Sequence, residues 1–126
     1  MLRLLPRLLI GALGVLALLG ALRLWIDPTL PAATLGLSPI GGLGLATMRA
    51  DVGGFFGGMG AFALAAALRN DRRLVTVPLA LVSLALTGRL ITAGMEGLAP
   101  DMVMPIVVEA VLAALFAIGR RTLGTR

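Results

Sequence analysis

Four long apolar stretches constrain this chain more than any other feature. They occupy residues 6–26, 43–68, 74–95 and 101–119, and each has about the ~20 residues that a membrane-spanning helix needs. The strict alternation of apolar and polar residues that is typical of membrane strands is absent from them. The pattern predicts an all-α fold in which residues 1–126 form a single domain, a bundle of four transmembrane helices.

The composition also indicates that lipid surrounds the chain. It is 59% hydrophobic and only 13% charged, whereas soluble domains are roughly 45–50% apolar. A charged start followed by an apolar stretch is also typical of a secretory signal peptide. The end of this stretch, "GALRLWIDP", has no small-x-small cleavage site, which favours a retained first helix.

The basic residues, all of them arginine, gather on one side of the predicted helices. Eight of the eleven lie at or before the start of the first helix, between the second and third, or after the fourth: Arg3, Arg7, Arg69, Arg72, Arg73, Arg120, Arg121 and Arg126. The opposite loops, at 27–42 and 94–101, contain none. Because basic loops stay on the cytoplasmic side, we expect cytoplasmic N and C termini. This topology explains the net charge of +5 without a nucleic-acid partner. The arginines on the cytoplasmic side would also attract the headgroups of anionic lipids.

The chain lacks cysteine, histidine and tyrosine altogether. Disulfides, cysteine or histidine metal sites and a Ser-His-Asp triad are therefore excluded. Met95, Met102 and Met104 cluster near the outer side, and flexible apolar filling explains them better than Cu(I) binding does. We expect no metal, no cofactor and no catalytic residue.

Apart from Arg7 and Asp101 at helix ends, five charged residues lie within the predicted helices, all in their outer third. Each helix carries at least one of them: Arg23, Arg49, Asp51, Arg89 and Glu109. Charges inside a membrane are costly, and they usually face the bundle interior and pair with one another. We therefore expect these five residues to meet in one buried layer, and they are the candidate binding residues.

The second predicted helix also carries five glycines within eight residues, namely Gly53, Gly54, Gly57, Gly58 and Gly60. At about 100° per residue, they fall on two opposite faces, one beneath Arg49 and the other beneath Asp51. Each face repeats the GxxxG spacing that lets membrane helices approach closely. The second helix is therefore expected to lie centrally, with a close neighbour on each face.

The outer loop at 27–42 is rich in proline. Pro28 ends the first helix because proline cannot continue it. The segment Pro31 to Leu37 is compatible with one or two turns of helix lying over the charged layer, and equally with a plain connector.

Three segments carry a family resemblance: "GLATMRADVGGFFGGMGAFAL", "ALTGRLITAGMEG" and "PIVVEAVLAAL". They resemble a family of small four-helix bacterial integral membrane proteins that is catalogued as a domain of unknown function. The family pattern falls on Arg49 with the following glycine pair, on Gly88 and Arg89 with Glu96 and Gly97, and on Glu109. The resemblance covers nearly the whole chain and implies the four-helix fold and the bacterial inner (cytoplasmic) membrane. It implies no activity.

Two functions fit these features. The first is a structural or accessory membrane protein, in which the charged layer fixes the helix register and the glycine faces pack within the chain, in a homo-oligomer or in a larger membrane complex. The alternative is a carrier or receptor for a small anion or lipid headgroup. Three arginines face only two acids in the expected layer, so one positive charge lacks a partner unless Arg23 extends to the lipid headgroups. A membrane enzyme is a third and less favoured function.

Overall fold

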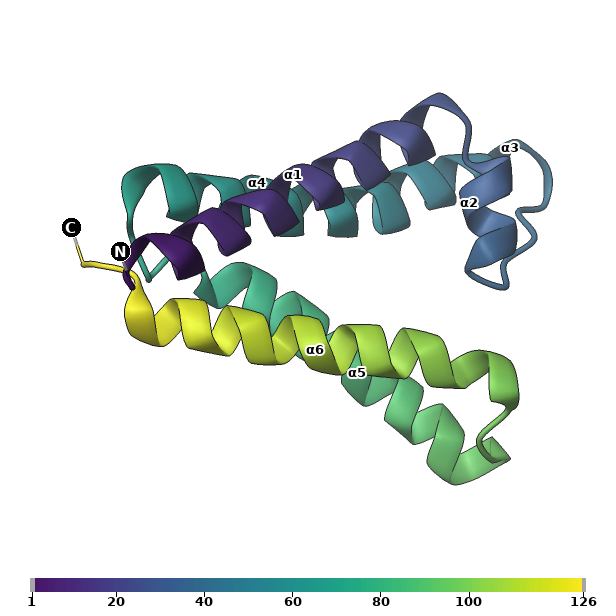
Figure 1. The fold of residues 1–126 in the computed structure, drawn as a ribbon. Helices are drawn as coiled ribbons and strands as arrows, with labels where there is room; N and C mark the ends of the chain where they lie inside the picture. Colours follow the sequence, from purple (N-terminus) through teal and green to yellow (C-terminus); the bar gives the residue numbers. More distant parts are fainter. Residues whose placement is uncertain (1, 126) are drawn as a thin grey trace.

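The computed structural model describes residues 2–125, which form an all-helical structure without strands (Figure 1). In chain order the helices are α1 (Leu4–Ile26), α2 (Thr29–Thr34), α3 (Gly41–Thr47), the π-helix η1 (Met48–Val52), α4 (Gly53–Arg69), α5 (Thr76–Glu96) and α6 (Pro100–Thr122). Four helical spans are long and apolar enough to cross a membrane: Leu4–Ile26, Gly41–Arg69, Thr76–Glu96 and Pro100–Thr122. The all-α prediction with four such helices is confirmed.

The second span is not a regular α-helix. It runs without a break from α3 through η1 into α4, and the five residues of η1 have π-helical geometry. Such π segments are rare, and they often mark functional sites. This one contains Arg49 and Asp51, and nothing in their spacing predicted it. The outer loop forms one short helix, α2, where the sequence allowed either a helix or a connector.

The helices pair as two hairpins (Figure 1). Helix α1 packs along α4, and α5 packs against α6. The hairpins come together at the end where both chain termini lie, and they diverge toward the end that holds α2 and α3. We call these the inner and outer ends. The inner end carries the arginine-rich turn between α4 and α5.

Helices α1 and α4 approach to backbone contact. A β-carbon at Gly60 would lie 2.7 Å from the carbonyl oxygen of Gly14 and 2.7 Å from the amide nitrogen of Leu18. A β-carbon at Gly14 would lie 2.6 Å from the amide nitrogen of Leu64. No side chain fits at either glycine, because the obstacle is backbone that cannot swing aside. The first glycine face of α4 therefore packs closely, as its spacing predicts.

The second glycine face differs from the expectation. Gly54 is exposed, and nothing lies within 4 Å of the position of its missing β-carbon. At Gly58 the nearest neighbour is a methyl group of Leu81, at 3.9 Å. Within residues 2–125, α4 thus has one close neighbour rather than two, because α5 diverges from it toward the outer end.

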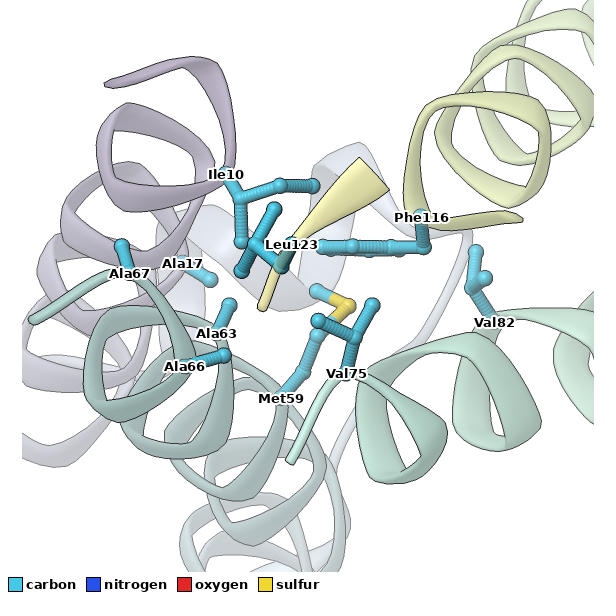
Figure 2. Close-up of a cluster of buried hydrophobic side chains, with 10 residues drawn as sticks. All are labelled: Ile10, Ala17, Met59, Ala63, Ala66, Ala67, Val75, Val82, Phe116 and Leu123. Carbon is cyan, nitrogen blue, oxygen red and sulfur yellow. The ribbon is translucent and has the colours of Figure 1, made fainter. Parts of the chain in front are cut away.

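The buried core occupies the junction between the hairpins (Figure 2). Alanines of α1 and α4, together with Ile10 and Met59, meet larger side chains from α5, α6 and the segments flanking them. The buried cluster is Ile10, Ala17, Met59, Ala63, Ala66, Ala67, Val75, Val82, Phe116 and Leu123. A β-carbon at Gly119 of α6 would lie 2.8 Å from the Ile10 side chain, so α1 and α6 also touch closely here.

Hydrogen bonds close the inner end. Arg7 donates to the carbonyl oxygens of Ala67 and Leu68, which lie in the last turn of α4 and have no helical donor. Asn70 follows in the left-handed conformation (φ 52°) and accepts a hydrogen bond from the Gly124 amide at 3.2 Å. These bonds tie α1, the turn after α4 and the tail after α6 together.

Two glycine substitutions distinguish the packed face of α4 from the open one. We expect Gly60→Ala to destabilise the protein by about 1–3 kcal/mol, because its methyl group would overlap the α1 backbone. Gly54→Ala should be neutral or slightly stabilising, since alanine favours helix and the site is open. Unfolding of both variants by SDS titration in mixed micelles measures the difference, and equal destabilisation would contradict the packing described here.

Candidate functional site

One ion pair joins α5 to α6. Arg89 Nε donates to Glu109 Oε1 at 2.7 Å, and it is the only salt bridge within the described part of the chain. The Glu109 side chain is 15% exposed and that of Arg89 is 35% exposed. A charge-assisted bond of this length is strong, and it pairs the two opposite charges between α5 and α6.

The second oxygen of Glu109 has no hydrogen-bond partner. Among residues 2–125, Glu109 Oε2 is the only buried side-chain nitrogen or oxygen atom that lacks a hydrogen-bond partner. A buried acceptor without a donor costs free energy, more so when it carries charge. Native structures contain few such atoms, and each calls for an explanation in structure or function.

Arg49 is held by Trp25 rather than by an acid. Arg49 Nε donates to the Trp25 carbonyl oxygen at 2.9 Å, and Trp25 Nε1 donates to the Arg49 carbonyl oxygen at 3.0 Å. The Trp25 carbonyl is one of the last four of α1, which have no helical donor. A cation there also interacts favourably with the helix dipole. Arg49 therefore caps α1 and fastens it to η1.

The indole ring of Trp25 explains two of the glycines. A β-carbon at Gly53 would lie 2.5 Å from Trp25 Nε1, and one at Gly57 would lie 3.3 Å from the far edge of the ring. The indole therefore lies directly over the start of α4. Any side chain at Gly53 would displace it and break the bond from the indole Nε1–H to the Arg49 carbonyl oxygen.

The five charged residues do not form one layer. Arg23 and Asp51 are exposed, and neither makes a side-chain hydrogen bond or ion pair with another described residue. Only Arg89 and Glu109 meet. The physical reason is the divergence of the hairpins, which puts Arg23, Arg49 and Asp51 on one hairpin and the ion pair on the other.

Asp27 forms part of the outer end of the first hairpin. Its carboxylate accepts hydrogen bonds from the Thr29 hydroxyl and from the Thr29 amide, the latter at 3.0 Å. These two bonds lower the pKa of Asp27, and the charges of Arg49 and Arg23 add to the effect. This turn at Asp27 leads into α2 and keeps the Asp27 carboxylate near Arg23 and Arg49.

A cavity of about 600 Å³ lies beside the ion pair. Its walls come from both hairpins and from the end of α2, and they are mainly apolar. Phe55, Phe56 and Met59 of α4 stand on one side, and α5 and α6 supply the other, with Arg89 and Glu109 in the lining. The volume lies within the roughly 300–1,000 Å³ of pockets that hold drug-sized molecules.

Sequence patterns did not reveal three features of this site. Asp101, the first residue of the fourth predicted helix, lines the cavity. Trp25 is the only tryptophan of the sequence, yet no sequence pattern predicts its hydrogen bonds with Arg49. No sequence pattern predicts the cavity, because the cavity depends on the distance between the two hairpins.

Comparison with known proteins identifies no relative of this chain. The chain matches no protein-family model, no curated protein sequence and no solved structure. The resemblance of its motifs to small four-helix bacterial membrane proteins stays a prediction.

The coupling between Arg89 and Glu109 can be measured by a double-mutant cycle. Arg89→Ala and Glu109→Ala should each destabilise the protein by about 2 kcal/mol, below the roughly 3–5 kcal/mol of a fully buried pair because Arg89 is partly exposed. The double variant should be more stable than the sum of the two losses predicts, since neither charge is then left alone. Unfolding in mixed micelles gives the three values, and strict additivity would show that the pair is not energetically coupled.

Proposed function

We propose that this protein binds a small amphipathic molecule in the cavity between its two hairpins, within the outer half of the membrane. The observation that carries the proposal is the cavity of about 600 Å³ with an ion pair in its wall, whose glutamate has a second, covered carboxylate oxygen without a partner. An apolar pocket with a few convergent polar groups is the usual form of a small-molecule site.

The position of the cavity supports a ligand that reaches it from the bilayer. Its walls belong to helices that are long and apolar enough to cross a membrane, so an apolar molecule could enter without passing through water. Helix α2 contributes Ala33 and Thr34 to the lining, which places it where it can restrict access from the outer surface. Binding rather than catalysis fits the lining, because it offers no nucleophile next to a base.

An accessory role in a larger membrane complex is the second candidate. It is favoured by the open glycine face of α4, on which Gly54 and Ala61 are exposed. Such a face suits the close approach of another membrane helix. A partner protein or a second copy of the chain would cover it.

We infer that the protein is inserted in the bacterial inner membrane with both termini in the cytoplasm. The N and C termini lie at the same end of the bundle (Figure 1). That end carries the arginines of the α4–α5 turn and of the segments flanking α1 and α6, and basic residues are retained on the cytoplasmic side. The cavity then opens in the half of the bundle that faces away from the cytoplasm.

Two neighbouring valines of α6 test the proposed binding function. Val108 lines the cavity and Val107 does not, while their exposure is similar at 47% and 50%. Val108→Trp should fill the cavity and abolish the retention of small amphipathic molecules, as measured by native mass spectrometry of the purified protein. Val107→Trp adds the same bulk on the lipid side and should retain them. Absence of any bound molecule from the unaltered protein, or equal retention by both variants, would refute the proposed site.

Reporter fusions test the orientation. A reporter that is active only in the cytoplasm should work when it is fused after Arg126. It should be inactive when inserted between Gly97 and Ala99, the connection between α5 and α6 at the outer end. The opposite pattern would place the arginine-rich end outside and overturn the proposed topology.

A further inference from the structure

We infer that the molecule bound in the cavity carries a protonated amine head group, so that the natural occupant is a cationic amphiphile rather than the anion suggested by the excess of arginine. This inference rests on the proposed binding function, and it names the chemical class of the ligand.

The charges of the lining favour a cation. One arginine and two acids line the cavity, Arg89, Asp101 and Glu109, and their formal charges sum to −1. The N-terminus of α6 offsets roughly half a charge at Asp101, so the lining stays negative. The arginines without an acidic partner, Arg23 and Arg49, are not part of this lining.

The lining holds several acceptors without a donor, beside the guanidinium of Arg89, of which only the Nε–H is bonded to Glu109. Glu109 Oε2 lacks a donor. Pro105 has no N–H, so the carbonyl of Asp101, four residues earlier, lacks its usual helical donor. The hydroxyl of Thr34 donates to the Leu30 carbonyl at 3.2 Å, which leaves its oxygen free only to accept. A ligand with several N–H groups complements these acceptors, whereas a carboxylate or phosphate would find side-chain donors only at the Nη groups of Arg89.

A small rotation makes the unpartnered oxygen accessible. Glu109 Oε2 is itself covered, although other atoms of Glu109 line the cavity. The terminal torsion of a glutamate side chain is broad and roughly two-fold, so the carboxylate can turn toward a ligand at low cost. One oxygen would then stay with Arg89 while the other accepts from the amine.

Matched twelve-carbon probes test the head-group preference of the unaltered protein. Radiolabelled dodecylamine is bound to the protein in nanodiscs of zwitterionic lipid, with empty nanodiscs as the control for partitioning. Unlabelled dodecylamine, dodecyltrimethylammonium, dodecanol and dodecanoate then compete for the site. We expect dodecylamine to compete about tenfold better than dodecanoate because of the charge of the lining. Dodecyltrimethylammonium lacks N–H donors, and dodecanol lacks charge, so both should compete less well than dodecylamine.

Variants locate the preference at the ion pair. Glu109→Gln keeps the shape of the side chain but leaves Arg89 unmatched, so it should weaken dodecylamine about tenfold and strengthen dodecanoate. Glu96→Gln removes an acid at the exposed end of α5, outside the lining, and should change neither affinity. If Glu109→Gln does not fold, Asp101→Asn at the mouth of the cavity serves as the second variant and should weaken dodecylamine to a smaller extent.

The outcomes separate the inference from the proposed function. Saturable binding with equal competition by the amine and the carboxylate would overturn the amine assignment while leaving the cavity a binding site. Preference for dodecanoate would overturn it in favour of an anion. No binding above that of empty nanodiscs would overturn the proposed function together with the inference.

Discussion

The backbone contact between α1 and α4 is the interaction on which the rest of the structure depends. Gly14 and Gly60 bring the two helices so close that the carbonyl oxygen of one glycine lies where a side chain on the other would stand. Lipid gives two helices no hydrophobic reason to associate, so packing of this kind must hold them together. At the inner end, Arg7 extends the contact by donating to the last carbonyls of α4. At the outer end, the reciprocal bonds between Trp25 and Arg49 do the same. The first hairpin is thus fastened at both ends.

The second hairpin is fastened to the first at one end only. Phe116, Gly119 and the tail at Leu123 pack against the first hairpin near the inner end, and the two hairpins diverge from there (Figures 1 and 2). This asymmetry creates the cavity and also separates the charges. An arginine on the first hairpin cannot reach an acid on the second across a cavity, so Arg49 satisfies its donors locally and Glu109 pairs within its own hairpin.

The sequence predicted the helices and some of their contacts, and it missed the features that depend on how far apart the two hairpins stand. Length and hydropathy were enough for the four spans, and GxxxG spacing was enough for the contact at Gly60. Helical periodicity could not decide which glycine face has a partner, because Gly54 and Gly60 follow the same spacing and differ only in what stands opposite. Depth along the helix grouped Arg89 correctly with Glu109, yet it also grouped Arg49 and Asp51 with them. Depth says nothing about lateral distance, and the π-helical turn at Met48–Val52 changes the direction in which both of these side chains leave the helix.

The same asymmetry explains why an unpartnered carboxylate oxygen is tolerated. Only 11% of the apolar stretch of α5, and 11% of that of α6, is buried within the chain, against 39% for the span that contains α4. The second hairpin is therefore less buried within the chain than the first hairpin. The unpartnered acceptor lies outside the buried core cluster, in the less buried of the two hairpins. A donor entering the cavity would satisfy Glu109 and would also touch both hairpins at the end where they do not touch each other. The Glu109 carboxylate, which lacks one hydrogen-bond partner, thus lies at the cavity between the hairpins, where a bound ligand would add contacts to both of them.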